Sequence, residues 1–449
     1  MKNKALLFLV LFLFGISAAE AQQKISMSLH DAVAMALEKS DNVGLANAKS
    51  ATREYELQSV KNNRYPDLKV SGQYLRLTNA NINLKSSEDA STTPGTTTEE
   101  KETPKVNQLI LGQANLTMPI FSGFKLKNSI AASESLYKSE VANATYTKEE
   151  MALKVVEYYG DLYKAQQSVL LFQENLKSGA QRVTDFTALE KNGVIARNDL
   201  LKSQLQVSKI ELSLADAEKN VKLLNYYLTT LLKLPEGTVI EVSPDNIDPN
   251  LFNNTVKTEA EALQSRKDLE SVRYLSKASE ANVKVAKAGY YPGFSFVSGY
   301  TALDLQNVVT VENAINVGVG VSYNLSSLFK NGKEVKAAKS KALEVQKQEA
   351  ILTDRIREEI VKAREEYELS LKKDKVYRQA VDQAAENYRI VKDKYDNGLS
   401  DTNDLLEADV EQLGAKINLT YAKANVALTY YELLQTSGQL LQSFNLTQN

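Results

Sequence analysis

Cysteine is absent from the sequence, and histidine occurs once, as His30. The absence of cysteine excludes disulfide bonds and a lipidated cysteine, and the chain cannot build a metal centre from histidine and cysteine ligands. No glycine-rich phosphate loop follows a strand-like segment. We therefore expect no metal, no cofactor and no catalytic residues, with stability that comes from packing or assembly. An enzyme would need two carboxylates that meet in a pocket, and a sequence does not show such a meeting.

Long apolar runs are also missing outside the first residues. Residues 1–21 contain two lysines, an apolar run from Ala5 to Phe14 and the small-residue ending Ala19-Glu20-Ala21, which is the pattern of a secretory signal peptide. That run is too short to span a membrane, and no later stretch approaches the roughly 20 apolar residues that a spanning helix needs. We expect an exported chain that begins near Gln22 and is not a helical membrane protein.

Neither sign of charge dominates the chain. It has 54 basic and 56 acidic residues and a formal net charge of −2. A balanced chain gives no bulk electrostatic reason to expect nucleic acid as a partner. The charges are interspersed, as they are on solvated helix faces.

Proline is scarce and confined to a few places. Because proline breaks helix interiors, the proline-free spans 120–234 and 293–449 are where long helices can run. Nearly 70 helical residues extend about 100 Å, which is longer than a compact core requires. Apolar residues recur every seven positions from Leu200 to Leu228 and again from Leu405 to Leu433, where Gln412 is the exception. A seven-residue repeat predicts helices that coil around each other.

Two pairs of related segments divide the chain into repeats. "NGVIARNDLL" begins at Asn192 and "NGLSDTNDLL" at Asn397, 205 positions later, and each reads as a helix-to-helix bend. Asn-Gly supplies the positive φ of a tight turn, and the following Asn-Asp suits a helix N-cap and first turn. "YPDLKVSGQYLRL" at Tyr65 and "YPGFSFVSGYTAL" at Tyr291 are 226 positions apart. The difference of 21 residues points to an insertion in the first repeat, which we place at 86–104, rich in Ser, Thr and Glu.

The predicted organisation is therefore two tandem repeats, 22–234 and 258–449, joined by a linker at 235–257. In the first repeat we expect helices within 28–63, a β-hairpin at 66–119, a long helix at 123–190, a bend at 191–198 and a return helix at 199–233. In the second we expect a helix at 258–289, a β-hairpin at 292–325, a long helix at 330–395, a bend at 396–402 and a return helix at 403–443. Ser28 and Asp31 have the capping-box arrangement of a helix start.

The strand segments alternate strictly between apolar and polar residues. From Ile315 to Leu325 the odd-numbered residues are apolar, and the even-numbered residues are polar or glycine. A strand of about 12 residues tilted near 45° rises about 28 Å, close to the hydrocarbon thickness of a bilayer. A soluble antiparallel sheet with one wet face gives the same alternation. If the strands cross a membrane, four per chain leave open edges, so several copies must close a barrel.

Taken together, these segments resemble the TolC-like outer-membrane efflux proteins over nearly the whole expected mature chain. The resemblance is carried by "SLHDAVAMALEKS" from Ser28, "PIFSGF" from Pro119, "DLESVRYLSKASEANVKVAKAGYYP" from Asp268 and the two Asn-Gly bends. It implies a mixed α/β membrane protein, a homotrimer whose 12-stranded β-barrel in outer-membrane lipid continues into a periplasmic α-helical barrel. It also implies an exit duct of a Gram-negative tripartite efflux or type I secretion system. The partners would be a periplasmic adaptor and an inner-membrane pump of the RND, ABC or MFS class.

The resemblance assigns roles to several residues. The linker would belong to an equatorial belt around the tunnel. Aromatic residues at the ends of the hairpins would lie at the membrane interface: Tyr65, Phe121, Tyr291 and Tyr323. The two bends would form the periplasmic tip and contact the adaptor through Asn192, Gly193, Val194, Asn397, Gly398 and Leu399. The alternative for both glycines is that they merely end helices, as glycine commonly does.

The return helix of the second repeat carries the predicted constriction. Asp404 and Glu407 are three residues apart on one helix face, and three chains would bring six carboxylates into one ring that favours cations. In the first repeat Asp199 and Lys202 cancel in charge. Alternatively, Asp404 and Asp199 only complement the positive ends of their helices, worth about 0.3–1 kcal/mol each.

The resemblance also implies a link that closes the tip, from Tyr395 to Asp199. The arginine that completes this link in the family is absent, because Ser400 stands in its place, and Arg197 is the candidate for a substitute salt bridge. Outside the family, the rival function is a secreted or periplasmic coiled-coil scaffold in which the alternating segments are ordinary hairpins.

Overall fold

The computed structural model describes residues 24–81, 105–242 and 256–446. The expected signal peptide, the expected insertion at 86–104 and most of the linker at 235–257 lie outside these residues. The chain divides into two compact units. Unit 1 contains residues 1–50, 139–272 and 348–449, and unit 2 contains residues 51–138 and 273–347.

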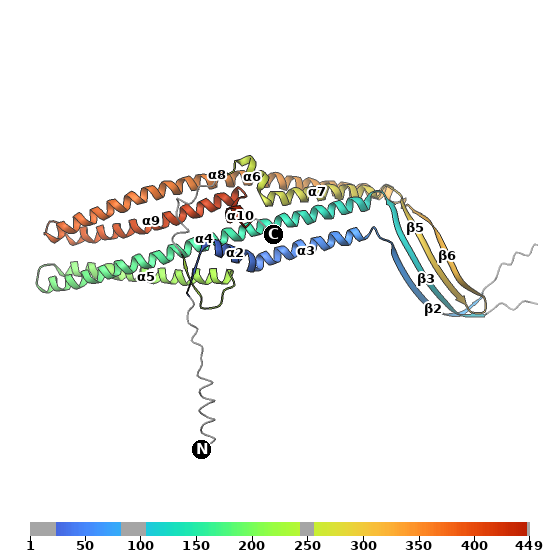
Figure 1. Ribbon diagram of the computed structural model, residues 1–449, viewed down its shortest axis with the longest axis horizontal. Coiled ribbons are helices and arrows are strands. Elements are labelled where there is room, and N and C mark those ends of the chain that lie inside the picture. Colours follow the sequence, from blue (N-terminus) through green and yellow to red (C-terminus); the bar gives the residue numbers. More distant parts are fainter. Residues whose placement is uncertain (1–23, 82–104, 243–255, 447–449) are drawn as a thin grey trace, which may run out of the picture. The chain divides into compact units, whose positions relative to one another are not determined.

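Unit 2 contains a four-stranded antiparallel sheet in the order β2-β3-β5-β6 (Figure 1). Its strands are β2 (Asp67–Asn81), β3 (Lys105–Ser122), β5 (Gly293–Leu305) and β6 (Val309–Ser322). Each repeat supplies one hairpin, and the two hairpins join where β3 pairs with β5. Within the described residues, β2 and β6 are therefore edge strands with one partner each.

The two faces of this sheet differ in polarity, as the alternation predicts. The register places Val317 opposite Ser298 and Val319 opposite Phe296, while Asn316 lies opposite Gly299. The side chains on the first face are mostly apolar: Leu68, Val70, Tyr74, Ile110, Leu116, Met118, Phe296, Tyr300, Ile315, Val317, Val319 and Val321. Those on the second face are mostly polar or absent: Lys69, Ser71, Gln113, Asn115, Thr117, Gly299, Thr301, Asn316, Gly318 and Gly320. Ile315 is 72% exposed and Val317 69% exposed, so a single chain leaves its apolar face uncovered.

Each sheet strand is connected to a helix by a tight corner. In "PIFSGF" Gly123 has φ +60°, and a Cβ there would lie 2.7 Å from the Ala288 carbonyl oxygen and 2.8 Å from Tyr291 Cβ. Both distances are shorter than the approach of a Cβ to a nonbonded oxygen or carbon atom. The backbone conformation of Gly123 is also left-handed. Glycine is therefore required where β3 turns into the following helix.

Unit 1 consists mainly of two helix hairpins, whose first helices begin within the residues of unit 2. Helix α4 (Lys125–Lys191) is followed by α5 (Arg197–Leu231), and α8 (Ser327–Asp396) by α9 (Thr402–Thr436). The predicted heptad positions of α5 face inward, since Leu200, Ser203 and Ile210 are buried, and so do those of α9, where Leu405, Ala408, Ala422, Val426 and Leu433 are buried. Across the described residues, none of the helices combines the length and the hydrophobicity that a membrane crossing requires.

The largest core of unit 1 joins the two ends of the chain. Strand β1 (Lys24–Met27) pairs in parallel with β4 (Val239–Val242), and α2 (Leu29–Lys39) and α10 (Leu440–Ser443) pack beside α4, α5 and α9. Ser28 caps α2 as predicted, because its side chain accepts a hydrogen bond from the Asp31 amide. Side-chain amides form hydrogen bonds with backbone groups on the outer edge of β4. Asn225 accepts from the Ile240 amide at 2.8 Å, and Gln166 donates to the Ile240 carbonyl at 2.7 Å.

Helix breaks correct two of the sequence-based boundaries. The single helix expected at 258–289 is wrong, because Arg266 separates α6 (Glu259–Ser265) from α7 (Lys267–Ala288) in an extended conformation with ψ 121°. The return helix expected at 403–443 is also wrong, since it ends at Thr436 and Gly438 adopts φ +66°. A Cβ on Gly438 would come within 3.2 Å of the Arg266 amide nitrogen, so the two breaks pack together. The helical residues at 28–63 form α2 and α3 (Asp41–Asn62), with Ser40 between them.

Candidate functional site

The two Asn-Gly bends have the same backbone geometry. Gly193 has φ +72° and Gly398 φ +71°, which confirms the predicted positive φ at both positions. The Gly193 amide donates to the Glu190 carbonyl, and the Val194 amide to the Leu189 carbonyl, both at 2.9 Å. The second bend repeats this pair of bonds from Gly398 and Leu399. This is the Schellman motif, which needs a left-handed residue at the first position after the helix cap.

Each bend presents an apolar side chain to its surroundings. Val194 is 67% exposed and Leu399 is 78% exposed. Asn192 and Asn397, which precede the glycines, turn their side chains back and donate to the carbonyls of Ala188 and Asp393. The bends are thus rigid corners whose outermost contact groups are aliphatic.

The helices that follow the bends begin earlier than the sequence suggests. Asn198 and Asn403 are not N-caps, because α5 begins at Arg197 and α9 at Thr402. Asp401 caps α9 by accepting hydrogen bonds from the amides of Asn403 and Asp404, whereas Ala196 has no side chain that can cap α5. The second bend is therefore fixed by one more side chain than the first.

A small apolar core lies behind both bends in unit 1. Phe186 of α4, Leu200 of α5 and Leu405 of α9 are buried together. Tyr395 of α8 packs against this core, with its ring stacked on Phe186 at a centroid distance of 5.8 Å. This core links the ends of the two helix hairpins within one chain.

The predicted constriction residues lie just beyond this core. Asp404 and Glu407 are both exposed on α9, and Asp404 accepts a 2.7 Å hydrogen bond from the Ser400 hydroxyl. Among the described residues, no basic side chain forms a salt bridge with either carboxylate. In the first repeat Asp199 is paired with Lys202 at 3.8 Å. The second repeat therefore presents the uncompensated charge.

The predicted tip-closing residues are not bonded to one another in this chain. Tyr395 stacks on Phe186, Asp199 pairs with Lys202, and Arg197 lies 3.7 Å from Glu190. Over the part of the chain that the structure describes, no hydrogen bond joins Tyr395 to Asp199. The link from Tyr395 to Asp199 and the role of Arg197 stay predictions for the assembled protein.

A buried ion pair near the bends does not follow from the sequence. Arg182 of α4 lies 3.0 Å from Asp409 of α9, and their side chains are only 10% and 5% exposed. Arg182 also donates to the Tyr388 hydroxyl of α8 at 3.4 Å, and Asn175 donates to Asp409 at 3.4 Å. Burial alone would lower the pKa of Arg182, but the hydrogen bond and charge of Asp409 outweigh it and raise the pKa. In the sequence both residues read as ordinary solvated helix charges.

The four predicted interface aromatics lie at the same end of the sheet in unit 2. Tyr65 and Tyr291 precede β2 and β5 and are 70% and 56% exposed. Phe121 lies near the end of β3, 6.1 Å from the Phe294 ring, and Tyr323 follows β6 and donates to the Tyr290 carbonyl at 3.4 Å. The structure thus brings these residues to one level, as an aromatic girdle requires.

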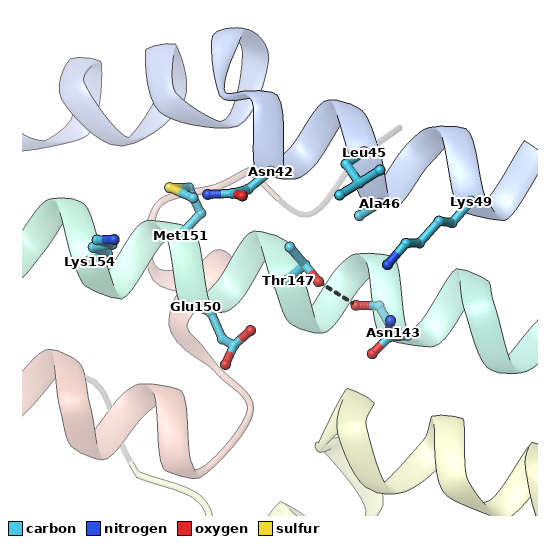
Figure 2. Close-up of a pocket in the computed structure, with 9 residues that line it drawn as sticks. All are labelled: Asn42, Leu45, Ala46, Lys49, Asn143, Thr147, Glu150, Met151 and Lys154. Atoms are coloured by element: carbon cyan, nitrogen blue, oxygen red, sulfur yellow. Dashed lines mark hydrogen bonds between the residues drawn. The ribbon is translucent and has the colours of Figure 1, made fainter. Parts of the chain in front are cut away.

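The grooves between helices of unit 1 do not resemble catalytic sites. Figure 2 shows one of about 290 Å³, where Lys49 of α3 reaches toward α4 beside Asn143 and Thr147. The Thr147 hydroxyl donates to the Asn143 carbonyl, and the charged side chains of Glu150 and Lys154 lie along the same helix. Within the described ranges, no three histidine, cysteine or acidic residues are placed to hold a metal ion.

The chain is similar in sequence and in fold to known outer-membrane proteins. The family model described as outer membrane efflux protein matches residues 260–439. The outer membrane efflux protein BepC of Brucella suis biovar 1 (strain 1330) is 22% identical over 328 residues, which are 72% of this chain and 71% of BepC. The outer membrane protein VceC from Vibrio cholerae has a TM-score of 0.75 at 16% identity, over 91% of this chain and 96% of VceC. The open state of the Neisseria gonorrhoeae MtrE outer membrane channel has a TM-score of 0.74 at 17% identity, over 92% and 89% of the two chains.

Proposed function

We propose that this chain, which belongs to the TolC-like outer-membrane efflux proteins, forms the exit duct of a tripartite efflux or type I secretion system. The family is one of transport channels rather than enzymes. In this proposal three copies close a barrel in the outer membrane of a Gram-negative bacterium, and their helices form a tunnel in the periplasm.

The observation that carries the proposal is the sheet of unit 2. One of its faces is apolar and exposed, the other is polar and rich in glycine, and within the described chain its strands β2 and β6 have free edges. A sheet in a bilayer must close on itself, because an unpaired edge leaves backbone groups without hydrogen bonds in hydrocarbon. If β6 of one copy pairs with β2 of the next, three copies of four strands give a closed 12-stranded barrel.

The helical part supports a duct with a regulated entrance. Two rigid bends per chain, each with an exposed aliphatic residue in Val194 or Leu399, give six similar corners in a trimer. We propose that a periplasmic adaptor contacts these corners, and that an inner-membrane pump acts through the adaptor to open them. The asparagine and glycine residues of the corners would set the shape that the adaptor recognises: Asn192, Gly193, Asn397 and Gly398.

The entrance itself would be lined by Asp404 and Glu407. Both are exposed, close to the bend and without a basic partner in the described chain, so three copies would concentrate negative charge in one ring. Tyr395, Asp199 and Arg197 would then control how tightly the ring closes.

Neutralising this ring should change the ion selectivity of the channel. In single-channel recordings, Asp404→Asn combined with Glu407→Gln should lower the cation preference roughly severalfold and weaken block by multivalent cations, because the focused negative potential is lost. The matched control is Asp216→Asn with Glu218→Gln, which removes the same charge from two exposed positions of α5 away from the bends. Unchanged selectivity in the first double variant would move the constriction elsewhere.

A further inference from the structure

The corner between α6 and α7 in unit 1 holds a buried arginine. Arg266 is 2% exposed and binds Asp268 through two hydrogen bonds, of 2.9 Å from Nε and 2.7 Å from Nη2. Its Nη2 also lies 3.0 Å from Glu359 of α8, and its Nη1 donates to the Thr436 carbonyl at the end of α9. One side chain therefore connects three helices, and its two carboxylate partners already compensate its charge.

Helix α4 brings a third carboxylate to this cluster. Glu149 is 4% exposed, and its Oε2 atom is fully buried without a hydrogen-bond partner in the described structure. On the same helix, the Tyr146 ring lies 5.9 Å from the Arg266 guanidinium, and Glu150 is exposed. An ionised Glu149 would thus be a buried charge without a full set of partners, which is costly.

The surrounding charges do not remove this cost. Burial is the main reason that the pKa of Glu149 is raised to about 7; Arg266, Lys267 and Lys257 lower it, and Asp268 raises it further. Lys257 itself donates to the Ser265 hydroxyl at 2.7 Å, which holds it beside α6. The pKa of Arg266 would be lowered by burial, but Asp268 and Glu359 raise it, so Arg266 keeps its charge throughout the pH range in which Glu149 titrates.

We propose that Glu149 is a proton-binding switch at the junction of α4 with the α6–α7 corner and the end of α9. The protonated carboxyl lets the junction pack tightly, and the ionised carboxylate loosens it. This role is independent of ion passage at the tip and of the number of copies in the barrel.

The direction of the pH effect follows from the raised pKa. A glutamate in an unfolded chain has a pKa near 4.5, whereas Glu149 in the folded chain has a pKa of about 7. The folded state therefore binds the proton more tightly, and its stability falls as pH rises from about 4.5 to about 7 and stays low above that. Glu149→Gln mimics the neutral carboxyl and should remove this loss.

Hydrogen exchange of the full-length protein in detergent tests the proposal. After correction for intrinsic rates, the wild type should exchange at least about fivefold faster at pH 8 than at pH 5.5 in residues 259–272 and 430–441, a change expected of a buried acid titrating between these values. Glu149→Gln should show the slow rates at both values. The control Glu150→Gln alters the adjacent exposed glutamate and should behave as the wild type.

Two results would overturn the proposal: equal corrected rates at both pH values in the wild type, or the same pH dependence in Glu149→Gln. Infrared spectra of the wild type provide a second measurement that needs no folded variant. A protonated carboxyl band that disappears between pH 6 and 8, the interval around the pKa of about 7, supports the switch, and the absence of any such band contradicts it.

Discussion

Lysine in place of Val317 should prevent the protein from assembling in the outer membrane. Val317 lies on the apolar face of β6, opposite Ser298, and is 69% exposed in the single chain. If this face contacts lipid, a lysine near the bilayer midplane costs about 2–4 kcal/mol in each chain. The expected result is loss of heat-modifiable oligomer from the outer-membrane fraction, with the variant degraded or retained in the periplasm.

The neighbouring residue provides a matched control for this experiment. Gly318 lies on the opposite, polar face of β6, and a Cβ there would meet no atom within 4 Å. Gly318→Lys adds the same charge one residue away and should assemble at close to the wild-type level. If both variants assemble equally well, the apolar face does not contact lipid and the sheet belongs to a soluble structure.

Removal of Arg182 should destabilise the helical unit more than any surface substitution. Arg182→Leu leaves a buried charge on Asp409, which among the described residues keeps the hydrogen bond from Asn175 alone. Removing one partner of a buried ion pair costs about 3–5 kcal/mol. Chemical denaturation followed by circular dichroism should show this loss. We also expect the helix ends near the bends to be less stable, because Arg182 connects α4 to Tyr388 of α8 and to α9.

Two further variants distinguish the loss of the ion pair from the loss of side-chain packing. Arg182→Leu combined with Asp409→Leu removes both charges and should recover most of the stability, since well-packed apolar residues often replace a buried pair without loss. Arg389→Leu removes an exposed arginine of α8 that pairs with Glu386 and Asp393, and it should leave stability almost unchanged. A double variant as unstable as Arg182→Leu would assign the effect to packing instead of charge.

The features that the sequence predicts well are those that depend on local periodicity. Alternation from Ile315 to Leu325 fixes which strand face is apolar, and the heptads from Leu200 and Leu405 fix which helix faces are buried. Asn192-Gly193 and Asn397-Gly398 mark the bends because a positive φ strongly favours glycine. Each of these signals lies within one segment, so no knowledge of distant contacts is needed to read it.

The features that the sequence does not predict depend on distant segments. The break at Arg266 is stabilised by Asp268 nearby but also by Glu359 and Thr436, and the pairing of β1 with β4 joins residues more than 200 positions apart. Arg182 and Asp409 are 227 positions apart and read as ordinary solvated charges until α4 and α9 are placed side by side. The sequence misplaces the N-cap of α9 because Asp401, two residues before Asn403, can cap the helix equally well.

The candidate site at the bends is likewise predicted only in part. Its positions follow from the bends, but the roles of Asp404, Glu407 and Tyr395 depend on neighbouring copies that one chain does not contain. The chain itself determines only that the two carboxylates are exposed and that Tyr395 packs on Phe186.

The most direct test of the central claim is the mass of the native particle in isolated outer membranes. Membranes from cells that express the full-length protein are separated by density, extracted with mild detergent and analysed by native mass spectrometry. The proposed 12-stranded barrel, with four strands from each chain, predicts that the protein is in the outer-membrane fraction as a particle of three chains. Recovery of a monomer in the soluble periplasmic fraction would contradict the channel and favour a periplasmic coiled-coil scaffold.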